Sequence, residues 1–353
     1  MSSERPTLKD IANTLGVSTT TVHRALQGKE GVSDETGAEI RRLAAEMGYR
    51  ANYMASALKR RVLRLAIVFP EPSQENQYYY RSLWQGARQF FQENREFFVE
   101  PVEFPYPLAP GAHGAVLKEL YLDHLDGLDG LLTLAVDHGQ SAYFLEKLSH
   151  HGVPIALVGA DLYRDLRLCC VKAQDELAGT LAAELLYSFR PGPFQDEVIL
   201  TGNPVGSFSM VDQARNVSGF EAAFRTHAPG ARLLTAYDPD VERSGRDLRR
   251  LLTDHPDVCA VYSVSARHTV MACQVLADLG LSGRVKLIGN DRFPESVAAL
   301  KAGVLTAVID KKVPQQSFRA ARLLFDYVLK GEAPPPAAVS VRPTILLRGN
   351  AEA

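Results

Sequence analysis

The sequence predicts a chain in two parts: an all-α head with a helix-turn-helix, and an α/β body of two doubly wound subdomains. Three observations lead to this fold class. Apolar residues recur at helical spacing over residues 8–47, and from Leu63 onward short apolar runs alternate with amphipathic stretches. The 353 residues are also too many for one compact core, since domains usually hold roughly 100–200 residues.

Composition excludes several classes of protein. Hydrophobic residues make up 46% and charged residues 23% of the chain, as in ordinary globular proteins. No apolar run approaches the ~20 residues that cross a bilayer, and the charged N-terminus is unlike a signal peptide, so we expect a cytoplasmic protein with no membrane partner. The cysteines lack C-x-x-C spacing. We therefore expect no metal, no cofactor and four reduced thiols at Cys169, Cys170, Cys259 and Cys273.

Charge is distributed unevenly along the chain. Residues 1–64 carry eleven Lys and Arg but only seven Asp and Glu, an excess of four positive charges. Because the whole chain has a formal net charge of −2, the remainder carries −6. A basic head on an acidic body is consistent with a head that contacts phosphate.

The head opens with two short helices. Thr7 suits the N-cap of a helix over residues 8–15, whose apolar residues share one face. Gly16 ends this helix, and Ser18 suits the N-cap of a second helix over residues 19–27. The few residues between the helices leave room only for a helix-turn-helix corner.

The outward face of the second helix is polar. It carries hydroxyls, an imidazole, a guanidinium and an amide, on Thr19, Thr20, His23, Arg24 and Gln27. Such groups bind phosphates or read base edges in the major groove, and the fork of Arg24 matches O6 and N7 of guanine. The alternative is a solvated polar face on an ordinary helical hairpin.

A third helix and a short hinge segment complete the head. Ser33 suits the N-cap of a helix that Gly48 ends. The hinge, residues 53–59, is far shorter than the ~12–15 residues that an isolated helix needs, so we expect it to fold only when supported. Leu58 would then be an apolar wedge in a minor groove. The alternative is a plain linker.

These segments, TLKDIANTLGVS, TTTVHRAL, VSDETGAEIRRLAAEMGYRAN and ASAL, stand in the order and spacing of the DNA-binding headpiece of the lac repressor (LacI/GalR) family. Residues 5–60 resemble that headpiece, with the helix-turn-helix at residues 8–27. The resemblance implies base contacts from Thr19, Thr20 and Arg24. It implies DNA contacts or headpiece positioning for Thr7, Ser18, Thr21, Gln27, Tyr49, Asn52, Leu58 and Lys59. His23 stands where the family usually has serine, so the resemblance leaves open whether this position contacts phosphate in the same way or in a pH-dependent way.

The body shows a regular alternation of strands and helices. Four apolar runs separated by helices cover residues 63–159, and a second series begins near Leu168 and ends at Asp310. This alternation favours parallel sheets covered by helices, and we expect one sheet for each series. Ligands of such sheets bind beyond the carboxyl ends of the strands.

Residues 63–348 resemble the periplasmic-binding-protein-like core that the same family uses for effector binding and dimerisation. The similar segments include DGLLTLAV, VPIALVGAD and KLIGNDRFPES. By this resemblance a helix near residues 312–330 crosses back to the first subdomain, and the tail returns to the second. The resulting effector candidates are Tyr80, Asp137, Gln174, Asp175, Arg215, Asn216, Ser263, Ser265 and Asp291. Several of these residues differ from the family's commonest ones. The effector could therefore be a polyol, a sugar acid or a phosphosugar as well as a plain hexose. Each could instead be a helix cap or a surface polar residue.

The resemblance implies a homodimeric transcription regulator that binds double-stranded operator DNA and responds to a small effector, a sugar, polyol or sugar derivative. Repression relieved by an inducer is the default that the family implies, and corepressor or activator modes stay open. A cytoplasmic sugar-binding sensor without operator specificity is the alternative. We do not expect an enzyme, because the sequence holds no P-loop, G-x-S-x-G or H-E-x-x-H motif and no G-x-G-x-x-G that opens a helix.

Overall fold

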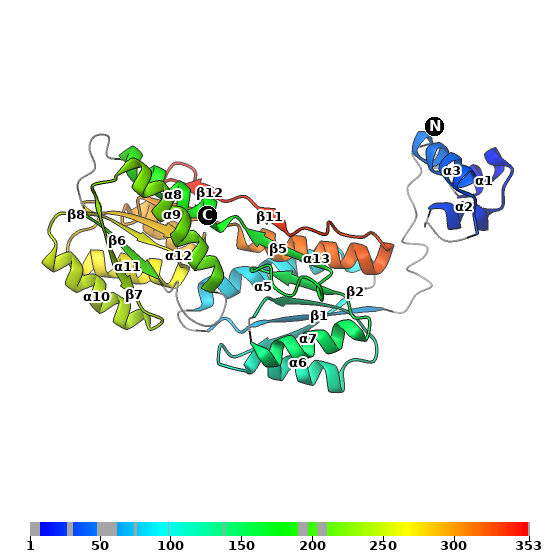
Figure 1. Cartoon of the computed structure of the whole chain (residues 1–353), viewed down its shortest axis with the longest axis horizontal. Coiled ribbons are helices and arrows are strands. Elements are labelled where there is room, and N and C mark those ends of the chain that lie inside the picture. The colour runs from blue at the N-terminus through cyan, green and yellow to red at the C-terminus, as the bar shows by residue number, and fades with distance from the viewer. Residues whose placement is uncertain are drawn as a thin grey trace. The chain divides into compact units, whose positions relative to one another are not determined.

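The structure is a computed structural model of the chain (Figure 1). It describes residues 8–26, 31–47, 62–73, 76–97, 99–136, 138–189, 197–202 and 210–351, without the side chains of residues 23 and 210–212. The chain forms two compact units. The described residues of the smaller unit include three helices near the N-terminus, and the larger unit begins at Val62 and contains two sheets.

In residues 8–26 and 31–47 the smaller unit forms a bundle of three short helices, α1 (Leu8–Leu15), α2 (Thr19–Leu26) and α3 (Asp34–Glu46). Their apolar faces meet in a core of buried residues: Ile11, Ala12, Val22, Ala25, Ile40 and Ala44. Gly16 has φ +65°, a conformation that glycine adopts without a steric penalty, and it opens the turn between α1 and α2. The predicted helix-turn-helix is confirmed.

A glycine inside α3 has a packing reason. Gly37 lies in the helix interior, where glycine lowers helix stability. A Cβ atom at Gly37 would lie only 3.1 Å from Nη1 of Arg41, and this Nη1 donates a hydrogen bond to the carbonyl oxygen of Ala25 at 3.3 Å. Gly37 therefore leaves room for the side chain that ties α3 to α2.

The first sheet of the larger unit has six parallel strands in the order β11-β5-β4-β3-β1-β2. The strands are β1 (Leu63–Pro70), β2 (Val99–Tyr106), β3 (Leu128–Leu134), β4 (Ile155–Val158), β5 (Cys169–Ala173) and β11 (Val339–Val341). Helices α6 (Ala112–Asp123) and α7 (Gly139–His150) cover one face, and α5 (Gln77–Glu93) and α13 (Val313–Lys330) cover the other (Figure 1). A 3₁₀ turn, Arg95–Phe97, follows α5. Because helices lie on both faces, β1 is buried except at Arg64.

The second sheet has the order β12-β10-β9-β8-β6-β7 and is parallel except for β12, which runs antiparallel to β10. Its strands are β6 (Glu197–Gly202), β7 (Arg232–Tyr237), β8 (Val258–Ser263), β9 (Lys286–Asn290), β10 (Ala307–Asp310) and β12 (Thr344–Leu346). Its helices are α8 (Asp175–Phe189), α9 (Met210–His227), α10 (Val241–Asp254), α11 (Ala266–Asp278) and α12 (Pro294–Ala302). Helices α8 and α9 are in backbone contact: a Cβ atom at Gly179 would lie 1.9 Å from the carbonyl oxygen of Asn216.

Three connections run between the two sheets. Strand β5 leads through Gln174 into α8, which packs against the second sheet. Strand β10 leads through Lys311 into α13, whose Ser317 Oγ donates a hydrogen bond of 2.7 Å to the carbonyl oxygen of Leu83 in α5. Residues 342–343 join β11 of the first sheet to β12 of the second. Helix α13 thus crosses back to the first sheet and the tail returns to the second, as the resemblance implied.

One expectation about the body is wrong. The strand at residues 169–173 opens the second series in the sequence pattern, yet β5 pairs with β4 and β11 in the first sheet. An apolar run identifies a strand but not its neighbours, since pairing depends on where the following helix packs.

The sequence pattern also misses helix α12. Its nine residues are too few to show a helical period. Two local signals mark its start: Pro294 occupies the first turn, and Ser296 Oγ accepts a hydrogen bond from the backbone N–H of Phe293 at 3.0 Å.

Among the described residues, no helix is both long enough and apolar enough to cross a membrane. All four cysteines lie in the described part of the chain as thiols; Cys169 and Cys170 are buried, and Cys259 and Cys273 are half-buried.

Candidate functional site

Helix α2 begins with a side-chain cap. Ser18 Oγ accepts a hydrogen bond from the backbone N–H of Thr21 at 3.0 Å and lies 2.8 Å from Thr21 Oγ1. The cap satisfies one of the backbone donors that the first turn of a helix leaves without a partner. Ser18 therefore fixes where α2 starts while its own side chain stays exposed.

The two faces of α2 differ in polarity. Val22 and Ala25 are buried against α1 and α3, whereas Thr19, Thr20 and Arg24 are exposed. The guanidinium of Arg24 lies beside Gly31, where a Cβ atom would be 3.2 Å from Nη1. An exposed helix face that carries hydroxyls and a guanidinium has the chemistry of a major-groove reader.

The remaining predicted DNA contacts lie outside the described residues: Thr7, Gln27, Tyr49, Asn52, Leu58 and Lys59, together with the hinge at residues 53–59. The backbone of His23 belongs to α2, but its side chain is outside the described part.

A buried lysine lies between two buried aspartates in the larger unit. Lys311 Nζ is 4.0 Å from Asp175 Oδ1 and 3.8 Å from Asp291 Oδ1. The exposed fractions are 7% for Lys311 and 4% for each aspartate. We call these three residues the Asp–Lys–Asp cluster. Both aspartates were predicted; Lys311 was missed, although it directly follows the strand LTAVID and so had the strand-end signal used for the other candidates.

Each member of the Asp–Lys–Asp cluster comes from a strand end or a crossing between the sheets. Asp291 follows β9, Lys311 follows β10, and Asp175 begins α8 after the crossing from β5. These segments belong to different parts of the chain, so only the folded sheets bring the charges together. The cluster therefore lies where two of the three connections between the sheets pass.

The Asp–Lys–Asp cluster leaves a buried acceptor unsatisfied. Asp291 Oδ1 is buried and accepts no hydrogen bond from the described residues, and its ion pair with Lys311 is longer than a hydrogen bond. Burial raises the pKa of Asp291, and the nearby Lys311 opposes that shift. Asp291 also has φ +69°, a strained conformation for a residue with a side chain. Buried acceptors of this kind call for a donor from water or from a ligand.

A hydrogen-bonded network in the core includes Asn290, the residue that precedes Asp291 of the Asp–Lys–Asp cluster. Asn216 Oδ1 accepts a hydrogen bond from the hydroxyl of Tyr262 at 2.5 Å, and Asn216 Nδ2 donates to Asn290 Oδ1 at 3.4 Å. Asn290 Nδ2 in turn donates to the carbonyl oxygen of Ser263 at 2.7 Å. The predicted candidate Asn216 is thus fully buried, with its amide used inside the protein.

Ser263 and Ser265 are also engaged in local hydrogen bonds. Ser263 Oγ donates to the carbonyl oxygen of Ser265 at 3.1 Å and accepts a hydrogen bond from Thr269 Oγ1 at 3.1 Å. Ser265 Oγ lies 2.7 Å from His268 Nδ1 at the start of α11. Burial lowers the pKa of His268 to about 4, so its imidazole is neutral at neutral pH. These hydrogen bonds fix the loop after β8.

The other predicted effector residues are dispersed. Tyr80 is buried in α5, and burial raises its pKa to about 12 although Arg267 opposes the shift. Gln174 is exposed next to Asp175, and Arg215 is half-buried in α9. Asp137 lies outside the described residues. The structure thus brings Asp175 and Asp291 together around Lys311, and Asn216 is hydrogen-bonded to Asn290, the residue before Asp291.

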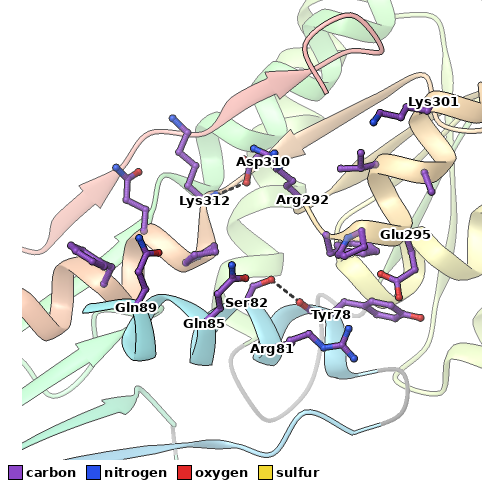
Figure 2. A pocket seen from close by; sticks show the side chains of 17 residues that line it. Tyr78, Arg81, Ser82, Gln85, Gln89, Arg292, Glu295, Lys301, Asp310 and Lys312 are labelled. Atoms are coloured by element: carbon purple, nitrogen blue, oxygen red, sulfur yellow. Dashed lines mark hydrogen bonds between the residues drawn. The ribbon is translucent and has the colours of Figure 1, made fainter. Parts of the chain in front are cut away.

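A cavity of about 1030 Å³ lies between α5, α12 and α13 (Figure 2). We call it the α5–α12–α13 cavity. Its charged lining residues are Arg81, Arg292, Glu295, Lys301, Asp310 and Lys312. Figure 2 shows Arg292 and Lys312 on either side of Asp310, which accepts a hydrogen bond of 2.8 Å from the backbone N–H of Lys312. None of the residues of the Asp–Lys–Asp cluster lines this cavity.

Comparison with known protein families gives two matches that together cover most of the chain. Residues 7–52 match the bacterial regulatory proteins of the lacI family, and residues 67–333 match the periplasmic binding protein domain. The first match covers α1, α2 and α3, and the second covers most of both sheets.

Individual relatives show the same two parts. The transcriptional regulator CelR of Thermobifida fusca is 26% identical over 365 residues, covering 98% of both chains. The regulator GntR of Pseudomonas aeruginosa is 46% identical over 54 residues, 15% of this chain and 16% of its own. The ribose import binding protein RbsB of Salmonella typhimurium is 34% identical over 116 residues, 32% of this chain and 38% of its own.

Solved structures share the fold of the larger part. The glucose-galactose binding protein GanP from Geobacillus stearothermophilus has a TM-score of 0.67 at 20% identity, covering 82% of this chain and 99% of its own. A putative LacI transcriptional regulator from Bacteroides fragilis has a TM-score of 0.69 at 19% identity, covering 82% and 98%. These likenesses establish the two-sheet architecture of the body.

Proposed function

Because the chain belongs to the LacI family of bacterial regulatory proteins and carries a periplasmic binding protein domain, we propose that it is a homodimeric repressor whose operator affinity is set by a sugar, a polyol or a sugar derivative. It is a DNA-binding transcriptional regulator by family. The relatives reported above are regulators and sugar-binding proteins, and we propose that this chain likewise is no enzyme and acts in the cytoplasm.

The exposed face of α2 supports the DNA-binding half of this proposal. Thr19, Thr20 and Arg24 project from a helix whose other face is buried, so they are available to the major groove without disturbing the core. In the dimer, each head reads one half of a near-palindromic operator. The proposed contacts are those predicted from sequence: Thr7, Ser18, Thr19, Thr20, Thr21, His23, Arg24, Gln27, Tyr49, Asn52, Leu58 and Lys59.

One observation carries the effector half: the buried Oδ1 of Asp291 accepts no hydrogen bond from the described residues and faces Lys311 across 3.8 Å. A sugar or polyol hydroxyl is a suitable donor, because it can donate to a carboxylate and accept from an ammonium group at once. A buried acceptor left without a donor costs about 1–3 kcal/mol, so an effector that supplies one gains binding free energy there.

The position of the Asp–Lys–Asp cluster supports a mechanism. Asp175 and Lys311 lie at two of the connections between the sheets. A ligand that binds Asp291 and rearranges the cluster therefore changes the contacts that fix these two connections. An effector shifts the protein toward the arrangement of the sheets that it binds more tightly. We propose that this arrangement sets the separation of the two hinge segments, residues 53–59, and thereby operator affinity.

The other effector residues remain proposals with differing support. Tyr80, Asp137, Gln174 and Arg215 are proposed contacts, whereas Asn216, Ser263 and Ser265 fit better as residues that position the strand ends, given their internal hydrogen bonds.

DNA-binding assays with chromosomal fragments at rising salt test the proposal. We expect one fragment to stay bound over competitor DNA, with affinity falling steeply as salt increases. A thermal-shift screen of sugars, polyols and sugar acids then identifies the effector, which raises the melting temperature and changes affinity for that fragment. Effector binding without preference for any fragment would support the alternative, a cytoplasmic sugar-binding sensor without operator specificity.

A further inference from the structure

In the described part of the chain the two sheets have four edge strands, and three of these are protected against pairing with another chain. Strand β2 contains two prolines, Pro101 and Pro105, and two glutamates, Glu100 and Glu103. Strands β11 and β12 are only three residues long. Prolines, charges and short length are common means by which proteins prevent edge-to-edge association of sheets.

The fourth edge strand, β7, lacks this protection. It is six residues long, and between Arg232 and Asp238 its sequence is LLTAY, without a proline or a charge. Among the described residues, β6 is the one strand that pairs with β7. Thr235 is exposed in the middle of β7, and Leu233 and Leu234 are half-buried. An open, uncharged edge of this length is a template for another strand.

The backbone of β7 shows which residues are open to a partner strand. The backbone N–H of Asp238 donates to the carbonyl oxygen of Gly202 at the end of β6, at 3.2 Å. Because neighbouring residues of a strand point their N–H and C=O groups to opposite sides, those of Leu233, Thr235 and Tyr237 point away from β6. A partner strand would therefore form its hydrogen bonds with these three residues.

A second copy of β7 fits this edge when it runs antiparallel with Thr235 opposite its own counterpart. In this register residues with outward backbone groups stand opposite one another, as hydrogen-bonded pairs require. Arg232 of one chain then stands opposite Asp238 of the other, so opposite charges meet at both ends of the interface. The side chain of Arg232 is 64% exposed, although its Nη1 contacts Glu197 at 2.8 Å. A shift by one residue would lose both the hydrogen-bonded pairs and the opposed charges.

The remaining pairs in this register are apolar. Leu233 stands opposite Tyr237 of the second copy, and Leu234 stands opposite Ala236. Leu233 and Tyr237 pack on one face of the sheet and Leu234 and Ala236 on the other, so each pair joins side chains of the same face. Cross-strand pairs of this kind stabilise antiparallel strands.

We propose that β7 is an interface between two copies of this chain, which pair antiparallel about a two-fold axis at Thr235. Two six-stranded sheets thereby become one continuous sheet. A surface that pairs with its own copy is complete after two partners, so it gives a closed assembly and not a fibre. This interface goes beyond the proposed function, because it forms with or without an operator.

Sedimentation velocity of the full chain over a range of concentrations tests the pairing. Thr235→Lys and Thr235→Glu each place like charges opposite one another at the centre of the interface, which disfavours pairing. An equimolar mixture of the two variants places opposite charges there instead. Thr226→Lys, at an exposed threonine of α9, is the matched control. Circular dichroism checks that each variant is folded.

At concentrations where the parent is fully associated, we expect each Thr235 variant alone to form an assembly of half the parent's mass, because like charges set face to face oppose association. The equimolar mixture should regain the parent's mass, and Thr226→Lys should keep it. The pairing is refuted if the parent does not associate, if Thr235→Lys keeps the parent's mass, if the mixture does not recover it, or if Thr226→Lys also loses it.

A cross-link gives a second measurement that does not depend on weakening the interface. Opposite residues of a hydrogen-bonded antiparallel pair have Cα atoms about 5.5 Å apart, a distance that a disulfide spans. Under mild oxidation Thr235→Cys should therefore join two chains on a non-reducing gel. Thr226→Cys and the parent, whose own cysteines are buried or half-buried, should not.

No cross-link in Thr235→Cys, or an equal one in Thr226→Cys, would contradict the pairing. Neither measurement uses DNA. A chain that pairs through β7 but prefers no operator fragment would therefore refute the proposed function alone, and a chain that binds its operator without pairing through β7 would refute this interface alone.

Discussion

The exposed face of α2 and the Asp–Lys–Asp cluster are proposed to bind ligands in opposite ways. Thr19, Thr20 and Arg24 are exposed on a single helix and need only that helix to be placed correctly. Lys311 and Asp291 are buried and follow two different strands, β10 and β9, so they meet because these strands pair in the second sheet. DNA is a large polyanion that an exposed surface can bind, whereas a small ligand binds in a site that encloses most of its surface.

This difference predicts that the two regions respond differently to substitution. A change on the face of α2 should alter binding with little effect on stability, because those side chains are solvated in the free protein. A change in the Asp–Lys–Asp cluster should alter stability as well as binding, because it leaves buried charge without compensation.

The largest effect is expected for Lys311→Met. Removing the lysine leaves Asp175 and Asp291 buried without their shared cation, and breaking a buried ion pair in this way destabilises a protein by about 3 kcal/mol. Urea unfolding at neutral pH, followed by a signal from the larger unit, measures the loss. Lys118→Met, on an exposed face of α6, is the control and should stay within about 0.5 kcal/mol of the parent. A Lys311→Met variant as stable as the parent would show that the cluster is not electrostatically coupled.

Arg24→Ala should weaken operator binding by about 1–3 kcal/mol per half-site and relax base preference there. The unfolding midpoint should stay close to that of the parent, because Arg24 is exposed. Fluorescence anisotropy with wild-type and substituted half-sites measures both properties. Arg42→Ala, an exposed arginine in α3 that pairs only loosely with Glu46, is the matched control. Unchanged affinity for Arg24→Ala would remove α2 as the recognition helix.

Ser18→Ala should show a smaller, mixed effect. It removes the cap of α2, and loss of such a cap costs about 1 kcal/mol. Thermal unfolding of the smaller unit, followed by circular dichroism of the full chain, should show the loss, with weaker operator binding beside it. Ser18→Asp restores a capping acceptor and should recover helix stability. If it does not, the contact of Ser18 Oγ with the backbone N–H of Thr21 is not what stabilises α2.

The smallest effect is expected in the pH dependence of stability. Burial raises the pKa of Asp291 above its unfolded value, so the folded state holds this proton to a higher pH than the unfolded state does. Stability at this residue therefore falls as pH rises from the unfolded pKa of about 4 through the raised folded pKa. Asp291→Asn has no such proton, so the parent should lose stability relative to this variant over that range. A constant difference across pH 4–7 would contradict the burial argument.

The sequence pattern predicted most of the elements but not all of their neighbours. Apolar alternation identified the strand at residues 169–173, yet the first sheet rather than the second contains it, because α8 crosses away after Gln174. Helix α12 was missed for its shortness. This helix forms one wall of the α5–α12–α13 cavity, so the sequence pattern did not predict the cavity.

The predicted effector residues likewise include some that the structure brings together and some whose side chains are already used inside the protein. Asp291, which follows β9, and Asp175, which begins α8 after β5, were predicted from these positions together with the resemblance, and Lys311 could have been found from its position after β10. Ser263 ends β8, and Asn216 in α9 was predicted from the resemblance, but the side chains of both are used in internal hydrogen bonds. A residue's position along a strand does not reveal whether its polar atoms are already satisfied.

By itself the sequence determined the helices of the head, the exposed polar face of α2 and the α/β character of the body, because helical and strand periods are local properties of the chain. Only the tertiary structure decided which strands share a sheet, that Lys311 lies between Asp175 and Asp291, and that Asp310 and Lys312 line a separate cavity. The reason is that these contacts join segments far apart in the chain, and their geometry is fixed by how helices and sheets pack rather than by any spacing in the sequence.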